Sequence, residues 1–84
     1  MVSQEKLNRL FWHSRRGMLE LDLLLVPFVQ EHYALIDKAD QDRYDTLITE
    51  EDQDLFAWLM KRSPANNSEN QIIIDLILER VSSK

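Results

Sequence analysis

The chain has 84 residues, of which 44% are hydrophobic, and its formal net charge at pH 7 is -5. This length predicts one small domain over residues 1–84, which buries only roughly 60 to 65% of the surface of the unfolded chain. The negative charge argues against a nucleic-acid binder, because neutralising phosphates requires a surplus of Lys and Arg. The absence of cysteine excludes disulfides and a thiol nucleophile, and it fits a reducing compartment.

No apolar segment of the chain is long enough to suggest a signal peptide or a membrane span. The N-terminus has no apolar core, and the run from Leu23 to Val29 is far shorter than the ~20 residues that a spanning helix needs. The sequence therefore predicts a cytoplasmic protein without membrane insertion.

Charge is distributed unevenly along the chain. Residues 1–19 carry a net charge of +3, whereas residues 20–54 carry -9. A basic corner on an acidic body indicates an oriented contact with a protein or an anionic ligand. The alternative is that these charges are simply the solvated faces of helices.

The first predicted helix begins after Ser3, whose hydroxyl can cap it, and it carries an apolar stripe of Leu7, Leu10 and Phe11. Trp12 either completes this stripe or lies at its rim. Gly17, the only glycine, is expected to end the helix in a left-handed conformation. Arg15 and Arg16 lie where cations suit the exposed carbonyls of a helix end.

A second helix is predicted from about Met18 to Tyr33, and it is apolar nearly all round. Such a helix belongs in the centre of a bundle, covered by several neighbours. Pro27 lies inside it, and we expect a kink there rather than a break. The predicted inward stripe consists of Leu21, Leu24, Leu25, Phe28 and His32, and Leu23 and Val26 are expected to widen it.

A third helix is predicted after Asp37, which with Asp40 resembles a capping box. Its apolar residues are Ala39, Tyr44, Leu47 and Ile48. A fourth short helix is expected after Thr49 or Asp52 as the cap, with Trp58 at the edge of its inner face. The inner residues of this fourth helix are Leu55, Phe56, Leu59 and Met60.

Pro64 and its polar neighbours predict a loop over residues 63–67. Ser68 with Gln71 reads as a capping box for a last helix, in which residues 82–84 are expected to fray. The predicted inner residues are Ile72, Ile73, Leu76, Ile77 and Val81, with Ile74 and Leu78 on a second, partner-facing edge. Five short helices without a strand pattern predict an all-α, compact antiparallel bundle.

The residues exclude several kinds of chemistry. The only histidines, His13 and His32, lie on different predicted helices, so no metal site is expected. A single glycine cannot form a phosphate-binding loop, so no cofactor is expected to bind stably. Glu20 and Asp22 lie about 200° apart around a helix and cannot both face one substrate. If one of them points outward, the other turns back toward the bundle, and both also suit a first helical turn.

Two motifs together resemble a known family. The first is Arg9, Trp12 and Arg15-Arg16-Gly17-Met18-x-Glu20-Leu21-Asp22, followed by Pro27-Phe28. The second is Asp54-Leu55-Phe56-x-Trp58-Leu59-Met60. The chain resembles the small bacterial flavinylation factors for succinate dehydrogenase, which are relatives of mitochondrial succinate dehydrogenase assembly factor 2.

This resemblance implies a five-helix assembly chaperone that is not itself an enzyme. Such a factor binds the flavoprotein subunit of succinate dehydrogenase, and often also that of fumarate reductase, and promotes covalent attachment of FAD to a histidine of that subunit. FAD is then the cofactor of the client, and the free factor is expected to be a monomer. The functional surface maps onto Arg16, Gly17 and Glu20, with Arg15, Asp22 and Arg9 as neighbours.

In the mechanism that we expect from the sequence, Arg16 makes a forked contact with the client. Glu20 contacts client donors or orients Arg16, and Gly17 allows close backbone approach. Two alternatives from other classes remain. One is a flavin carrier or transferase that itself binds FAD, and the other is an antitoxin-like regulatory interaction protein.

Overall fold

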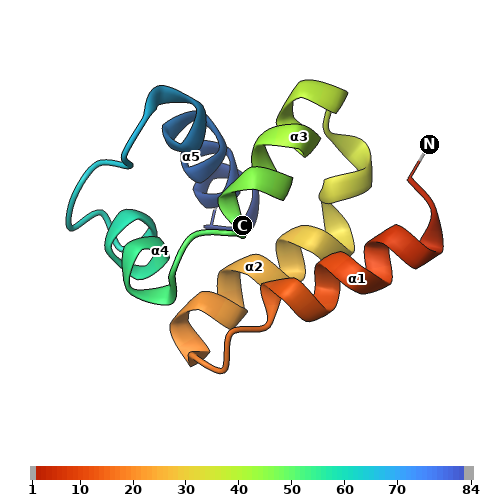
Figure 1. Ribbon diagram of the computed structural model, residues 1–84, viewed down its shortest axis with the longest axis horizontal. Helices are drawn as coiled ribbons and strands as arrows, with labels where there is room; N and C mark the ends of the chain where they lie inside the picture. The colour runs from red at the N-terminus through yellow and green to blue at the C-terminus, as the bar shows by residue number, and fades with distance from the viewer. Residues whose placement is uncertain (1, 83–84) are drawn as a thin grey trace.

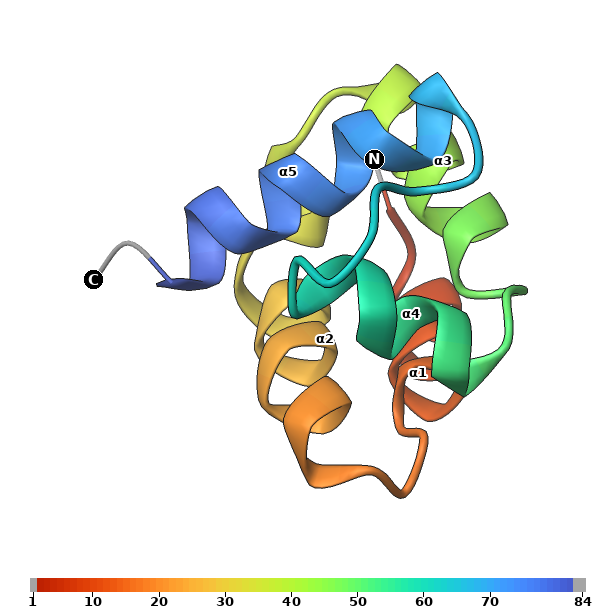
Figure 2. The ribbon, with the colours of Figure 1, turned by 90° about the vertical axis from the view of Figure 1, so that its left-hand side faces the viewer.

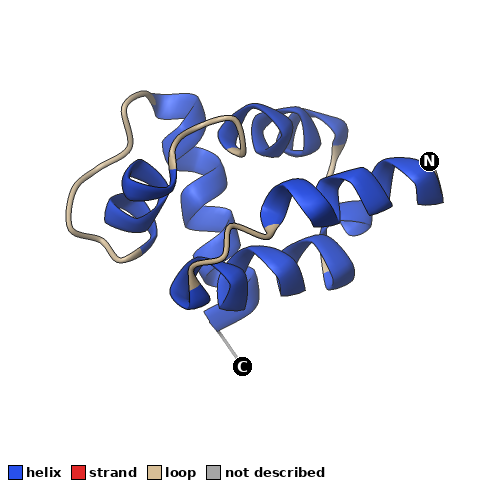
Figure 3. Cartoon of the chain, turned by 60° about the horizontal axis from the view of Figure 1, so that its bottom comes forward, coloured by secondary structure: helices blue, strands red, loops and turns tan. Residues whose placement is uncertain are grey.

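The computed structural model describes residues 2–82, and all regular secondary structure within that range is helical. Five α-helices and one 3-10 helix follow one another along the chain (Figure 3). They are α1 (Gln4–Ser14), α2 (Leu19–Glu31), η1 (Tyr33–Leu35), α3 (Lys38–Leu47), α4 (Asp52–Leu59) and α5 (Ser68–Ser82). The predicted all-α class with five helices is confirmed, and the 3-10 helix is an addition to it.

Helix α2 is the central element, because it contacts α1, η1, α4 and α5. Figure 1 shows α1 and α2 together along the bottom, with α3 and α5 above them and α4 at the left. The linker of residues 15–18, which joins α1 to α2, is the lowest part of the molecule in Figure 2. No helix within residues 2–82 combines the length and the apolar character that crossing a membrane requires.

Helix α1 begins as predicted. The hydroxyl of Ser3 accepts a hydrogen bond from the backbone N–H of Lys6 at 3.1 Å, which satisfies one of the free donors of the first turn. Leu10 is buried, and Leu7 and Phe11 are half-buried against the core. Trp12 lies outside this stripe with 65% of its surface exposed, so it is a rim residue.

Helix α2 runs through Pro27 without a break and ends at Glu31. Its inner face consists of Leu21, Leu25, Phe28 and Val29, while the predicted Leu24 and His32 are only half-buried. Leu23, predicted to widen this face, has 61% of its surface exposed, so that expectation was wrong. The second predicted helix was too long at its C-terminal end, because His32 caps α2 and the chain tightens into η1. This turn places Tyr33 fully in the core.

Helix α3 has the predicted cap, since Oδ1 of Asp37 accepts the backbone N–H of Asp40 at 2.9 Å. The Asp40 carboxylate instead accepts from Arg43 at 2.7 Å, so this half of the capping box differs from the prediction. Of the apolar residues of this helix, Ala39 is exposed, and the polar Gln41 is buried. The Gln41 amide donates to the carbonyls of residues 33 and 36.

Two tyrosines connect the helices through buried hydroxyl groups. Ser14, the last residue of α1, and Tyr44 on α3 share a hydrogen bond of 2.6 Å. The Tyr33 hydroxyl donates to Asp45 at 2.7 Å, and Lys6 pairs with the same carboxylate at 3.1 Å. Burial raises the pKa of both phenols, so both hydroxyl groups remain protonated over the physiological pH range. These contacts fix both the first turn and the last residue of α1 against α3.

Helix α4 differs from the prediction at its beginning. Neither Thr49 nor Asp52 caps it: Glu51 occupies the cap position without a side-chain hydrogen bond. The Thr49 hydroxyl donates back to the Thr46 carbonyl at 2.6 Å. Trp58, predicted at an edge, is buried with 7% of its surface exposed.

Helix α4 ends in a complete Schellman motif. The backbone N–H of Arg62 donates to the Ala57 carbonyl at 2.8 Å, and that of Lys61 donates to the Trp58 carbonyl at 3.2 Å. Lys61 has a φ of +60°, the only positive φ outside glycine in the described residues. Glycine is the usual residue at such a position, because a side chain there costs about 1 kcal/mol.

Helix α5 is capped by Asn67, whose Oδ1 accepts the backbone N–H of Asn70 at 2.8 Å. The predicted cap Ser68 is the first residue of the helix instead. The Gln71 side chain accepts from the backbone N–H of Ala65 at 2.8 Å, so it holds the preceding loop. The helix continues to Ser82, which was expected to fray, and residues 83 and 84 lie outside the described range.

The buried face of α5 is rotated from the predicted one. Asn70, Ile73, Ile74 and Ile77 are buried. Ile72, predicted in the core, has 43% of its surface exposed, and the predicted Leu76 and Val81 are only partly buried. Ile74, predicted to face a partner, is fully buried, so that expectation was wrong.

Candidate functional site

The guanidinium of Arg16 points into the protein, toward the junction of α3 and α4. Its Nη2 donates to the carbonyl of Ile48, the residue that caps the end of α3. Its Nη1 lies 3.5 Å from Oδ1 of Asp52, the first residue of α4, and only 16% of the side chain is exposed. Arg16 therefore joins the α1–α2 linker to the α3–α4 junction.

These contacts change the role that the sequence suggested for Arg16. Both terminal nitrogens of its fork already have partners within the chain. Its Nε is buried without a hydrogen-bond partner among the described residues, so it faces no solvent either. Arg16 is therefore placed as an internal brace, and no free fork is presented to another protein. Sequence reasoning missed Ile48 and Asp52 as its partners, because the pattern gave no signal linking such distant positions.

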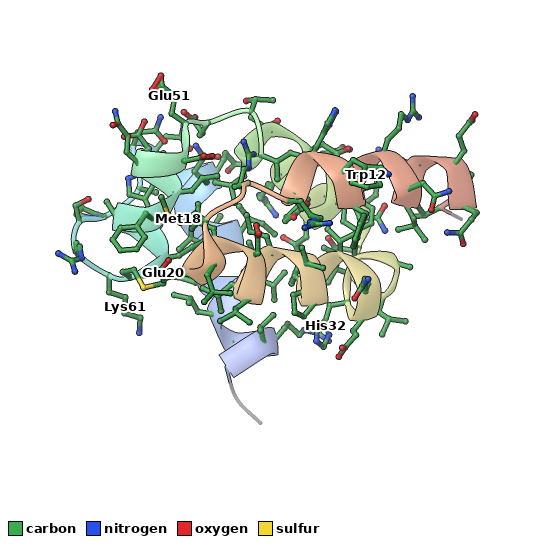
Figure 4. All side chains as sticks on the ribbon, turned by 90° about the horizontal axis from the view of Figure 1, so that it is seen from below. Trp12, Met18, Glu20, His32, Glu51 and Lys61 are labelled. Atoms are coloured by element: carbon green, nitrogen blue, oxygen red, sulfur yellow. The ribbon has the colours of Figure 1, made fainter. Side chains whose placement is uncertain are left out.

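The two acids of the first turn of α2 have different environments. Oδ1 of Asp22 accepts the backbone N–H of Arg16 at 2.8 Å, so this half-buried carboxylate holds the linker closed. Glu20 is exposed, and Figure 4 shows its side chain near Met18 at the beginning of α2. The geometry thus assigns Asp22 to the linker and leaves the Glu20 carboxylate at the surface, a choice that the sequence left open.

Gly17 has the left-handed conformation that was predicted, with a φ of +77°. It does not end α1, however, because the helix ends at Ser14 and Arg15 caps it in an extended conformation. The buried hydrogen bond between Ser14 and Tyr44 fixes that end, and the chain then leaves the helix before it reaches Gly17. Gly17 therefore shapes the linker, where it is exposed.

Substitution of Gly17 is expected to cost conformational free energy without a steric clash. A Cβ added at Gly17 would meet no atom within 4 Å, so only the positive φ opposes a side chain. We expect Gly17→Ala to lower the free energy of unfolding by about 1 kcal/mol, and Gly17→Asn to lower it less, because asparagine tolerates this conformation. Urea denaturation measures both, and an alanine variant as stable as wild type would contradict the strain argument.

The outer face of α1 carries an exposed aromatic and cationic group. The Arg15 guanidinium lies 5.9 Å from the centre of the Trp12 ring, which is a cation–π contact. Arg9 is exposed one turn earlier on the same helix. Five exposed residues on and around the α1–α2 linker make up what we call the corner surface: Arg9, Trp12, Arg15, Gly17 and Glu20. Leu19, the first residue of α2, is also exposed and adjoins Glu20 in the sequence.

The corner surface includes four of the six residues that the sequence singled out, while Arg16 and Asp22 support it from below. This arrangement offers cations, one carboxylate and an exposed indole to a partner. Within residues 2–82, no three side chains of the metal-binding types come close enough to hold an ion. The chemistry on offer at this surface is recognition by charge, hydrogen bonding and aromatic contact.

Comparisons with known proteins agree over nearly the whole chain. A family model described as flavinator of succinate dehydrogenase matches residues 8–81. The chain is 54% identical to a Pseudomonas putida protein named FAD assembly factor SdhE, over 100% of both chains. It is 51% identical to a Pseudomonas aeruginosa protein of the same name, over 96% of both chains. The solution structure of a UPF0350 protein matches with a TM-score of 0.79 and 35% identity, covering 99% of this chain and 88% of that one.

Proposed function

This chain belongs to the family of flavinators of succinate dehydrogenase, and from that premise we propose that it binds the flavoprotein subunit of this enzyme and promotes covalent attachment of FAD to it. Relatives that match 96 to 100% of its length are named FAD assembly factors. The flavoprotein subunit of fumarate reductase is a second client in this proposal. The chain acts as a cytoplasmic monomer, and FAD is held by the client.

The corner surface supports this role because it combines an exposed carboxylate with an open backbone. Glu20 reaches the surface at the beginning of α2, and the neighbouring linker has no side chain at Gly17, where the space around the backbone is open. A client segment can therefore approach the linker backbone closely while its donors meet Glu20. Arg16 and Asp22 keep the linker in this shape through their internal contacts.

The mechanism is selection of a client conformation. A binder accelerates a step in its client only if it binds the competent state more tightly than the others. The corner surface would hold the flavoprotein subunit with its histidine and FAD in reacting position. The bond itself forms between FAD and the client, so this chain contributes binding free energy and no catalytic group.

The test is flavinylation of the purified flavoprotein subunit with and without this chain. We expect the two proteins to co-purify, and in-gel flavin fluorescence after denaturation to increase strongly when the chain is present. A parallel sample with the fumarate reductase subunit tests the second client. Unchanged fluorescence in both samples would contradict the proposal.

Two further measurements separate the other classes. Titration of the chain alone with FAD should show no tight stoichiometric binding, whereas tight binding would indicate a flavin carrier. Capture of a toxin or a cytoskeletal protein, without any dehydrogenase subunit, would indicate an antitoxin-like regulator.

Light scattering of the free chain should give the mass of a monomer.

A further inference from the structure

Lys61 occupies a backbone position that is unfavourable for a lysine. It lies in the left-handed region at the end of α4, where the Schellman motif fixes its φ at +60°. The negative end of the helix dipole favours a cation near this position, but a lysine in the last turn of α4 would gain the same benefit with a helical φ. Residues held in such conformations cluster at functional surfaces, so the lysine side chain itself requires an explanation.

The ammonium of Lys61 forms no ion pair with another residue in the described range 2–82. The ion pairs of the described residues use Lys6, Arg16, Lys38 and Arg43 as their cations. The neighbouring Arg62 has its guanidinium 5.4 Å from the centre of the Phe56 ring. Lys61 is exposed, and although Asp75 and Glu79 line the same surface hollow, neither forms an ion pair with it. Its ammonium is therefore available to a group outside the molecule.

Lys61 lies at the same end of the molecule as the corner surface. Helix α4 packs against α2, and Figure 4 shows Lys61 projecting outward near Glu20 and Met18. Figure 1 likewise places α4 and the beginning of α2 at the same, left-hand end. A partner that covers Glu20 can therefore also reach Lys61. The two opposite charges would then fix the partner's orientation, as complementary charges do at other interfaces.

We propose that Lys61 extends the corner surface and binds a carboxylate on the flavoprotein subunit. This inference rests on the proposed function, because it assigns a further contact to the same client. In this proposal, Lys61 contributes to recognition of the client although its left-handed backbone conformation lowers the stability of the chain. The expected signature is a substitution that stabilises the chain and weakens its complex.

The test compares Lys61→Gly and Lys61→Asn with wild type in two measurements. Glycine and asparagine both suit the left-handed position, and for glycine we expect the thermal midpoint to rise by roughly 4 to 8 °C, the equivalent of about 1 kcal/mol in a chain of this size. Affinity for the purified flavoprotein subunit, measured by calorimetry, should fall roughly fivefold to tenfold for both variants. The remaining affinity should depend less on salt concentration, because one charge contact is gone.

Lys38→Ala is the matched control, because it removes the same charge from an exposed lysine at the beginning of α3. It should leave the affinity unchanged. If Lys61→Gly raises the midpoint but binds as tightly as wild type, Lys61 is not a contact, and the proposed function stands without it. If wild type itself fails to bind the subunit, the proposed function is wrong and the inference is wrong with it.

Discussion

Replacement of Arg16 by alanine is expected to lower the free energy of unfolding by about 2 to 3 kcal/mol. The guanidinium donates to the Ile48 carbonyl, and a charged hydrogen bond of this kind contributes about 1.5 to 3 kcal/mol. The pair with Asp52 adds less than about 1 kcal/mol, because that carboxylate is 42% exposed and screened by water. For a chain of this size the melting temperature should fall by roughly 10 to 20 °C.

Arg15→Ala is the control for this experiment, because it removes the same side chain from the adjacent position. Arg15 is exposed, and its guanidinium lies over the Trp12 ring. Loss of that contact costs only about 0.5 to 1 kcal/mol. Arg16→Lys should recover only part of the stability, since one ammonium cannot reach both partners in a fork.

A melting temperature for Arg16→Ala as high as that of Arg15→Ala would show that the internal contacts contribute little. If Arg16→Ala melts like wild type and yet fails to support flavinylation, the guanidinium must leave its internal partners to bind the client. The two variants therefore separate a brace from a direct contact.

Helix number and order could be predicted from the sequence because the apolar spacing is local. Ser3 and Asp37 cap α1 and α3 as expected, since each is the only good cap before its apolar stripe. At α5 three adjacent residues qualify, Asn66, Asn67 and Ser68, and Asn67 is the cap. The sequence offers no rule for choosing between neighbours of equal capping strength.

The rotation of α5 was mispredicted for a different reason. Its buried positions 70, 73, 74 and 77 follow helical spacing, but the first of them is Asn70. The Asn70 amide is satisfied by Asn66 and Glu50, so a polar residue begins the buried face. Gln41 on α3 is likewise a buried polar residue, and its amide donates to two backbone carbonyls. A pattern that counts only apolar residues cannot detect a buried carboxamide whose partners come from other segments.

The candidate site was predictable as a set of residues but not as a geometry. Arg16, Gly17 and Glu20 stand out by residue type and spacing, yet their roles depend on distant groups. Arg16 points inward because the Ile48 carbonyl and Asp52 lie there once α3 and α4 have packed. The direction of a long side chain is set by tertiary contacts, which local sequence does not contain.

The different environments of Glu20 and Asp22 lead to opposite expectations for their alanine variants. The free energy of unfolding of Glu20→Ala should lie within about 1 kcal/mol of the wild-type value. This variant loses only the favourable interaction of an exposed acid with the first turn of a helix. The rate of flavinylation of the flavoprotein subunit should nevertheless fall at least about tenfold, which corresponds to about 1.4 kcal/mol of lost binding to the competent state. Glu20→Gln keeps the shape and tests the charge alone.

Asp22→Ala should show the reverse, with stability reduced by about 1 to 2 kcal/mol because the Arg16 backbone N–H loses its acceptor. Asp22→Asn keeps an acceptor oxygen and should restore most of that loss. Flavinylation by Asp22→Asn, measured well below the melting temperature, should approach wild type, since Glu20 remains in place. If Glu20→Ala supports full flavinylation while Asp22→Asn does not, the client contacts the inner acid, and the linker must open before it binds.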